Sequence, residues 1–321
     1  MKILITGVAG FIGSNLAEKL LSAGNRIVGL DNFDPFYDKR IKLNNLQQLS
    51  KNPYFSFYEG DILDNALLNK LFSNEKIEIV IHLAAKAGVR PSILDPVGYY
   101  HTNVIGTLNI LEAMKKYQVK KMVFASSSSV YGNNETVPFM ETDIVDFPIS
   151  PYAASKKAGE LLCHTYHHLY GFDIFCMRFF TVYGPKQRPD LAIHKFTKAL
   201  INQEEIPFYG DGSSRRDYTH ISDIINGIEC AIEKIEGFNI FNLGESKTTS
   251  LSELVEYLEK YTNEKAKLIK LPFQPGDVNI TYANTEKARK LLNYHPTMNI
   301  DDGLKEFVEW FKRDLSIHPV S

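Results

Sequence analysis

Cysteine is scarce in this chain of 321 residues, and its three copies argue against disulfide bonds. Cys163, Cys176 and Cys230 lie in apolar surroundings without paired or metal-ligand spacing, so we expect buried small side chains, no metal site and a reducing compartment. No uninterrupted apolar run reaches the length that crosses a membrane. A signal-peptide pattern is also lacking after Met1, so the cytoplasm is the expected location.

An excess of one charge is lacking too. The net charge is −2 and no long basic run occurs, which argues against a general nucleic-acid binder, although a local basic pocket for a phosphorylated small molecule is compatible with it. A composition of 44% hydrophobic and 23% charged residues is typical of a globular protein with a large core. The length fits one large domain or two.

A glycine-rich turn is the first motif present. It separates an apolar run at residues 2–6, which predicts a buried strand, from a helical pattern at residues 14–22. The glycines are Gly7, Gly10 and Gly13. They allow a tight turn and the close approach of a pyrophosphate to the helix N-terminus, where free N–H groups favour anions.

Asp31 supports a dinucleotide as the ligand of this turn. It ends a second predicted strand, residues 26–30, at about the ~20-residue distance where a carboxylate binds an adenosine ribose diol. Asp31 would repel a 2′-phosphate, and no arginine immediately follows it. The sequence therefore favours NAD over NADP.

Strands and helices continue to alternate, which predicts a parallel, doubly wound sheet. The predicted strands are residues 55–59, 77–83 and 121–125, and the helices are residues 65–72 and 104–117. Asp61, Ala84 and Ala85 follow strand ends, where such sheets bind ligands, so they are candidates for adenine and ribose contacts. Ordinary turn chemistry is the alternative for these three residues.

Tyr152 and Lys156 form a candidate proton-transfer pair. If residues 153–169 are helical, the two side chains lie one turn apart on one face. An adjacent cation favours the phenolate, so Tyr152 could act as a base although a free phenol titrates near ~10. The serine run 126–129 follows a predicted strand and would open onto the same crevice. Alone, the Tyr-x-x-x-Lys spacing is more often a packed ring beside a solvated amine.

Together, the motifs resemble the extended short-chain dehydrogenase/reductase family, and within it the nucleotide-sugar 4-epimerases. The resemblance covers nearly the whole chain and rests on Gly7-x-x-Gly10-x-x-Gly13, Asn103-Val-Ile-Gly-Thr107, Ser126-Ser-Ser-Ser-Val-Tyr-Gly132, Tyr152-x-x-x-Lys156 and Arg215-Arg-Asp-Tyr218. It implies that Tyr152 is the acid/base, that Lys156 holds the nicotinamide ribose and depresses the Tyr152 pKa, and that Ser127 binds the reacting hydroxyl. It also implies NAD that stays bound through turnover, and a homodimer formed through helices near residues 104–117 and 153–169. The implied cofactor residues are Gly7, Gly10, Phe11, Ile12, Gly13, Asp31, Asn32, Asp61, Ile62, Leu83, Ala84, Ala85, Lys86, Asn103, Tyr152 and Lys156.

Four segments narrow the resemblance to the UDP-glucuronate 4-epimerases: residues 85–90, 178–185, 188–190 and 274–278. Thr181 stands where the glucose and N-acetylhexosamine enzymes usually carry Asn, and Gln274 where many members have Arg. Lys86 departs from the glucuronate group, which commonly has Gln there. The implied substrate residues are Arg90, Ser127, Ser128, Ser129, Thr181, Arg188, Arg216 and Asp277. Arg216, in a glycine-rich loop, suits a diphosphate.

The predicted fold is α/β: a doubly wound parallel (Rossmann) sheet with a smaller C-terminal α/β substrate domain. Residues 1–178 are the expected NAD-binding domain, with residues 221–244 returning to it, and residues 179–321 mainly form the substrate domain. A strand is predicted at residues 240–244, and Trp310 is expected in the core of the last helix. Helices are predicted at residues 193–202, 221–235, 251–261, 286–292 and 301–312.

Three functions are compatible with these residues. The first is conversion of UDP-glucuronate to UDP-galacturonate through a transient 4-keto sugar and NADH. The second is the same chemistry on UDP-glucose or UDP-N-acetylglucosamine. The third is a nonenzymatic NAD-binding sensor, against which Tyr152, Lys156 and Ser127 argue together because a sensor would be expected to lose them.

Overall fold

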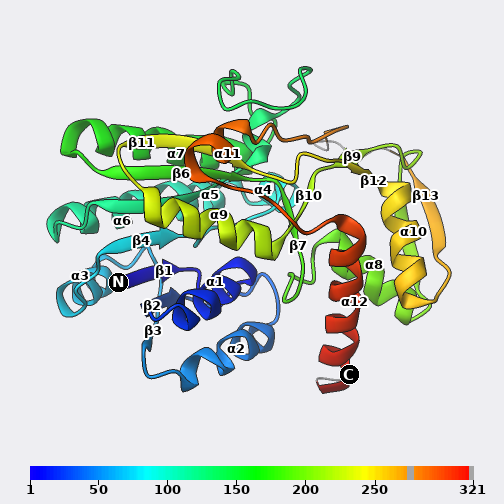
Figure 1. The fold of residues 1–321 in the computed structure, drawn as a ribbon, viewed down its shortest axis with the longest axis horizontal. Coiled ribbons are helices and arrows are strands. Elements are labelled where there is room, and N and C mark those ends of the chain that lie inside the picture. The colour runs from blue at the N-terminus through cyan, green and yellow to red at the C-terminus, as the bar shows by residue number, and fades with distance from the viewer. Residues whose placement is uncertain (273–277, 318–321) are drawn as a thin grey trace.

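A seven-stranded parallel sheet forms the centre of the computed structural model, which describes residues 1–272 and 278–317 (Figure 1). Its order is β11-β6-β5-β4-β1-β2-β3, and each neighbouring pair is parallel. The chain leaves β1 toward opposite edges of the sheet, so the carboxyl ends of β1 and β4 border the crevice where doubly wound sheets bind ligands. The strands are β1 Lys2–Thr6, β2 Arg26–Asp31, β3 Phe55–Glu59, β4 Ile79–His82, β5 Lys121–Ser127, β6 Asp173–Phe179 and β11 Phe238–Leu243.

Helices cover both faces of this sheet, which explains why its central strands are nearly continuous apolar runs. One face packs against α3 Asn65–Asn74, α6 Gly106–Lys116 and α7 Pro151–Tyr170. The other packs against α1 Phe11–Ser22, α2 Lys39–Gln47, α9 Ile221–Lys234 and α11 Glu286–Leu292.

A second core lies beside the sheet, on the right of Figure 1. Its helices are α8 Ala192–Ile201, α10 Leu251–Thr262 and α12 Ile300–Ile317. Three two-stranded sheets accompany them: β7 Thr181–Tyr183 with β10 Tyr218–His220, β8 Glu205–Tyr209 with β13 Lys267–Leu271, and β9 Arg215–Arg216 with β12 Thr249–Ser250. After β10 the chain returns to the main sheet, where β11 pairs with β6.

Most predicted elements of the sheet are confirmed. The expected helix at residues 104–117 is also confirmed, although it starts earlier, as a wider π-helical segment, His101–Ile105, before α6. Two short helices, α4 Val89–Leu94 and α5 Pro96–Tyr100, precede it. One detail of the prediction is wrong: Cys163 and Cys176 are buried, but Cys230 on α9 packs against the core while staying partly exposed. Trp310 packs against the second core while remaining partly exposed.

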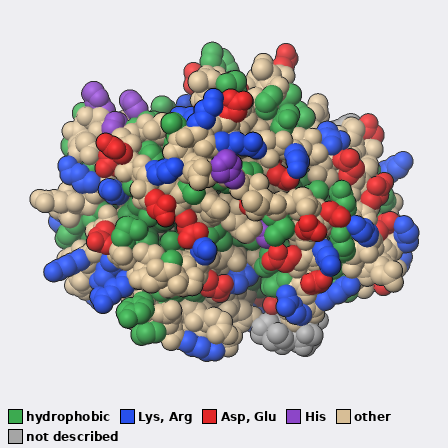
Figure 2. Space-filling model, viewed as in Figure 1, with side chains coloured by type: hydrophobic (Ala, Val, Ile, Leu, Met, Phe, Trp, Pro, Cys, Tyr) green, Lys and Arg blue, Asp and Glu red, His purple; other side chains and the backbone are tan. Residues whose placement is uncertain are grey.

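Charge is mixed over the surface. On the face in Figure 2, acidic and basic side chains alternate over the described residues without a broad area of one sign. Among the described residues, no helix is both long and apolar enough to cross a membrane.

Candidate active site

A cavity of about 600 Å³ lies at the carboxyl ends of the central strands and contains most of the predicted site. Its wall combines the glycine turn, the loops after β2, β3 and β4, the serine run, the start of α7 and residues of β7 and the following loop. The predicted cofactor residues on this wall are Gly7, Gly10, Phe11, Ile12, Gly13, Asp31, Asn32, Asp61, Ile62, Leu83, Ala84, Ala85, Lys86, Tyr152 and Lys156. The predicted substrate residues on it are Ser127, Ser128, Ser129, Thr181 and Arg188.

The glycine turn provides a cradle that a side chain would fill. Gly7 has a φ of +73°, and a Cβ there would lie 2.8 Å from the backbone nitrogen of Ala84. A Cβ at Gly13 would collide with the Gly7 carbonyl oxygen. Because α1 starts at Phe11, the turn exposes the helix N-terminus to the cavity, which suits a pyrophosphate.

Asp31 places a carboxylate beside this cradle. Its Oδ2 accepts a hydrogen bond from the Ala9 N–H at 3.0 Å, and its Oδ1 accepts one from the Phe33 N–H at 2.8 Å. Burial raises its pKa, and the two backbone donors oppose that shift. Nearby, Asp61 accepts a hydrogen bond from the Asn32 amide at 2.7 Å. These contacts fix both carboxylates on the cavity wall.

Sequence reasoning missed Tyr37 and Lys42, which also line the cavity. The Lys42 amine donates to the Asp34 carbonyl oxygen at 2.6 Å and lies 4.4 Å from the centre of the Tyr37 ring. Burial lowers the Lys42 pKa, whereas Asp31 and Asp34 oppose the shift. The Asp38 side chain, which caps α2, is the one local signal that could have located this helix.

Tyr152 and Lys156 lie in the first turns of α7, as predicted. The hydroxyl of Ser150 caps this helix by accepting from the Ala153 N–H, and Pro151 occupies its first position. The Lys156 amine donates to the Ala125 carbonyl oxygen at 2.7 Å. The helix therefore brings the phenol and the amine to the end of β5.

The electrostatics of the pair differ from the prediction that the lysine depresses the tyrosine pKa. Burial raises the Tyr152 pKa, and a hydrogen bond with Ser127 and the charge of Arg188 only partly offset this effect. Burial also lowers the Lys156 pKa to about 8. Both groups are desolvated, which favours their neutral forms, and the cation that acts on Tyr152 is Arg188.

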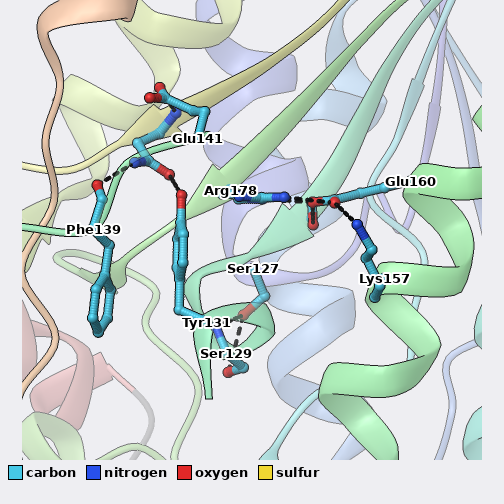
Figure 3. A network of polar contacts seen from close by, with 10 residues as sticks. Ser127, Ser129, Tyr131, Phe139, Glu141, Lys157, Glu160 and Arg178 are labelled. Carbon is cyan, nitrogen blue, oxygen red and sulfur yellow. Dashed lines mark hydrogen bonds and ion pairs between the residues drawn. The ribbon is translucent and has the colours of Figure 1, made fainter. Parts of the chain in front are cut away.

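The serine run forms a tight turn on the cavity wall, shown in Figure 3. Ser127 donates to the Ser129 hydroxyl at 3.1 Å and accepts from the Ser129 N–H at 3.1 Å. Ser126 also lines the cavity, but its hydroxyl donates to Glu160 at 2.6 Å. Ser127, Ser128 and Ser129 line the cavity with it, whereas the Ser126 hydroxyl is held by α7.

Arg188 reaches the cavity while paired with a carboxylate. Two of its nitrogens donate to Asp190 at 2.9 and 2.7 Å, and its guanidinium lies 5.4 Å from the centre of the Phe36 ring. The same loop is joined to α1, where Asn15 donates to the Pro185 carbonyl oxygen at 3.1 Å. The contact with Asn15 holds the loop after β7 against α1.

Three other predicted residues, all within the described part of the chain, lie outside the cavity wall. Asn103 holds the loop after β4, because its side chain bonds the backbone nitrogen and oxygen of Lys86 at 2.8 and 2.9 Å. The Arg90 guanidinium lies 5.2 Å from the centre of the Tyr209 ring. Arg216 donates to the Arg215 carbonyl oxygen at 2.9 Å. Asp277 and Gln274 lie outside the described residues.

Lys86, which departs from the pattern of the glucuronate enzymes, does line the cavity. Its amine forms an ion pair with Asp95 at 2.9 Å. Asp95 also caps α5 by accepting from the Gly98 N–H at 3.0 Å. The lysine therefore connects two parts of the loop that borders the cavity.

Comparison with known proteins shows which proteins this chain resembles. A family model described as GDP-mannose 4,6 dehydratase matches residues 4–307. A protein of Thermodesulfobacterium geofontis named UDP-glucuronate 4-epimerase is 45% identical over 315 residues, covering 98% of this chain and 97% of the relative.

Solved structures agree with this relationship. The UDP-glucuronic acid 4-epimerase of Bacillus cereus, in complex with UDP-glucuronic acid and NAD, is 39% identical and has a TM-score of 0.92, with 98% of this chain and 99% of that chain covered. The UDP-glucose 4-epimerase of Thermotoga maritima with UDP-glucose is 34% identical and has a TM-score of 0.91, with 98% and 100% covered. From its Tyr-x-x-x-Lys spacing, its glycine cradle and a similarity that spans nearly the whole chain, we conclude that the chain belongs to the GDP-mannose 4,6-dehydratase family of extended short-chain dehydrogenases/reductases.

Proposed function

We propose that this protein is an NAD-dependent UDP-glucuronate 4-epimerase, which converts UDP-glucuronate to UDP-galacturonate. The observation that carries the proposal is one cavity lined by Tyr152 and Ser127 together with the glycine cradle and Asp31. A phenol and a hydroxyl thus share one space with a glycine cradle suited to a pyrophosphate, which supports the proposal. The glucuronate relatives above support the choice of sugar.

The chain contributes proton transfer and positioning. When bound, NAD supplies the acceptor, and in its reduced form the donor, of the C4 hydride. Tyr152 takes the proton of the sugar 4-hydroxyl and later returns it, while Ser127 hydrogen-bonds the reacting oxygen. Rotation of the 4-keto sugar about its diphosphate linkage presents the opposite face, so that the returning hydride inverts C4.

The buried amine of Lys156 has a positioning role in this scheme. Its hydrogen bond to the Ala125 carbonyl oxygen fixes it beside the serine turn, where it can hold the nicotinamide ribose. In the same scheme Gly7, Gly10 and Gly13 bind the pyrophosphate and Asp31 binds the adenosine ribose.

The carboxylate of the sugar is assigned to the hydroxyls of Ser128, Ser129 and Thr181. All three line the cavity, and hydroxyls can hold a carboxylate without repelling it. Arg188 adds a cation at the same wall, although Asp190 already neutralises much of its charge. Arg90, Arg216 and Asp277 remain predictions for substrate binding.

A second candidate is epimerisation of a neutral UDP-hexose, which the similarity to the Thermotoga maritima enzyme favours. The test is incubation of the purified protein with UDP-glucuronate, UDP-glucose and UDP-N-acetylglucosamine, followed by chromatographic separation of the products. The proposal expects UDP-galacturonate as the main product. Equal turnover of UDP-glucose would support the second candidate, and failure to turn over any of the three sugars would favour the NAD-binding sensor.

We also propose that the chain forms two domains with different ligands. Residues 1–178, together with residues 221–244, bind NAD, and residues 179–321 mainly bind the UDP-sugar. The pairing of β11 with β6 supports the return of the second segment to the first domain.

A homodimer is also proposed, with the cytoplasm as its location. Leu94, Val97 and Leu161 expose 88%, 78% and 57% of their surface on α4, α5 and α7, which pack side by side. A second copy would cover this apolar area. Free cysteines support a reducing compartment.

A further inference from the structure

A buried ion pair lies directly behind the serine turn and is not used by the chemistry proposed above. Glu160 on α7 and Arg178 on β6 expose only 2% and 1% of their side chains. Arg178 donates to the two carboxylate oxygens of Glu160 at 2.8 and 2.9 Å. Figure 3 shows this pair beside the turn that carries Ser127 and Ser129.

Such a pair is poorly explained as a source of stability. The cost of removing two charges from water usually cancels their attraction. Well-packed apolar residues in the same place often stabilise a fold equally well. What a buried pair with fixed hydrogen bonds can supply is a defined geometry.

The first group is the residue before Ser127. Tyr152, Lys156 and Glu160 are spaced four residues apart, so they share one face of α7. Lys156 bonds the carbonyl oxygen of Ala125, and Glu160 accepts the hydroxyl hydrogen of Ser126 at 2.6 Å. Two consecutive residues of β5 are thereby tied to the helix that carries Tyr152.

The second group is the residue that ends the turn. The Arg178 guanidinium lies 4.8 Å from the centre of the Tyr131 ring. The Tyr131 hydroxyl donates to the Asn242 side chain on β11 at 2.7 Å. Arg178 is also the register partner of Ser126 across β5 and β6. The ion pair therefore contacts the turn on both sides of the three serines, at Ser126 and at Tyr131.

We propose that Glu160 and Arg178 are positioning residues, which act through Ser126 and Tyr131 to hold the Ser127 hydroxyl against Tyr152. The hydrogen bonds between Ser127 and Ser129 cannot fix the turn in place, because both residues belong to it. This inference rests on the proposed role of Ser127 in the epimerase.

Ser126→Ala is the variant that tests this role most gently. It removes one hydrogen bond, while Glu160 keeps both bonds from Arg178, so the fold is expected to persist. Turnover of UDP-glucuronate should fall about 10-fold with KM and bound NAD nearly unchanged, since small misplacements of reacting groups cost up to ~10²-fold. Ser126→Thr, which keeps a hydroxyl, should restore most of the activity. Thr197→Ala removes a buried hydroxyl from α8 and is the matched control, with turnover expected to stay normal.

The decisive measurement is a double-mutant cycle with Ser127→Ala. If Ser126 acts through Ser127, then adding Ser126→Ala to Ser127→Ala lowers turnover by less than about twofold, because nothing remains to be positioned. The same 10-fold loss in both backgrounds would overturn the inference and leave Ser126 a structural residue. Crystal structures of the wild type and Ser126→Ala give a readout independent of activity: the inference requires that the Ser127 hydroxyl moves away from Tyr152. A wild type that turns over no UDP-sugar would refute the proposed function, whereas an unmoved Ser127 would refute this inference alone.

Discussion

The amine of Lys156 donates a 2.7 Å hydrogen bond to the carbonyl oxygen of Ala125, which joins α7 to the end of β5. The amine also lies 5.3 Å from the centre of the Phe124 ring. These contacts partly replace the water that burial removes, although the Lys156 pKa still falls to about 8. The protein's own contacts thus fix the helix that carries Tyr152 relative to the serine turn.

Replacement of the phenol tests the central role in the proposed reaction. Tyr152→Phe should lower turnover of UDP-glucuronate by roughly 10²- to 10⁴-fold, the usual scale for a positioned acid/base. The fold and the bound NAD should persist, because the ring that packs against Tyr99 is kept. Steady-state kinetics and nucleotide content measure both effects. Tyr257→Phe, on the second core, is the control, and near-normal activity of Tyr152→Phe would refute the role.

The cofactor preference follows from the carboxylate of Asp31. We expect NAD to bind much more tightly than NADP, because a 2′-phosphate would lie beside a carboxylate already fixed by two backbone N–H groups. Calorimetry with the two nucleotides measures the difference. Asp31→Asn should reduce the difference between the two affinities, mainly by weakening NAD binding. Equal affinities in the wild type would contradict the assignment of Asp31 to the ribose.

Much of this site could be predicted because its signals are local. Gly7, Asp31 and Tyr152 each stand at a fixed distance from a strand or helix that the apolar pattern already indicates, and all three line the cavity. The same locality explains why the elements of the main sheet were predicted closely. Their positions depend on short stretches of sequence and on the rule that parallel strands end at one edge.

The residues that prediction missed depend on contacts between distant segments. Lys42 lines the cavity because α2 packs beside the glycine turn, where the Asn45 amide donates to the Ala9 carbonyl oxygen, and no periodic pattern encodes that contact. The partnership of Glu160 with Arg178 joins a helix to a strand, and each residue alone resembles a surface charge. Burial of Tyr152 is another property of the assembled fold, which is why its pKa moves opposite to the prediction.

A stability measurement can test the electrostatics of the loop that follows β11. Burial, opposed by Lys247 and assisted by Asp217, raises the Glu245 pKa from 4.5 to about 7. The folded state therefore holds this proton more tightly than the unfolded state, so Glu245 lowers the unfolding free energy as the pH rises from about 4.5 to about 7.

Glu245→Gln removes that dependence. Relative to the wild type, the variant should gain roughly 1–3 kcal/mol of unfolding free energy between pH 4.5 and pH 8, since one pKa unit corresponds to ~1.4 kcal/mol. Urea denaturation at the two pH values measures the change. Parallel pH profiles for the two proteins would show that Glu245 titrates normally.

The last prediction concerns the sugar carboxylate. The 4-keto form of a uronate is a β-keto acid, which loses carbon dioxide fastest when the breaking C5–carboxylate bond stands perpendicular to the carbonyl plane. Ser128, Ser129 and Thr181 line the cavity beside Tyr152, where they can hold that bond near the plane. Hydrogen bonds to a charged group contribute ~1.5–3 kcal/mol each, enough to select one orientation in a dry site.

Replacement of Ser128 and Thr181 by Ala should therefore release a detectable share of UDP-4-keto-pentose, or its reduced pentose, during turnover of UDP-glucuronate. Ser129 is left intact because its hydroxyl also accepts from Ser127, so its loss would disturb the reacting hydroxyl as well. Chromatography with mass detection separates the UDP-pentose from the UDP-hexuronate products. The single variants show whether one hydroxyl is enough to prevent decarboxylation. Slower turnover without any pentose would mean that the two residues orient the sugar but do not protect the intermediate. A wild type that epimerises UDP-glucose as readily as UDP-glucuronate would remove the need for a carboxylate site altogether, because a neutral hexose offers these hydroxyls no charge to hold.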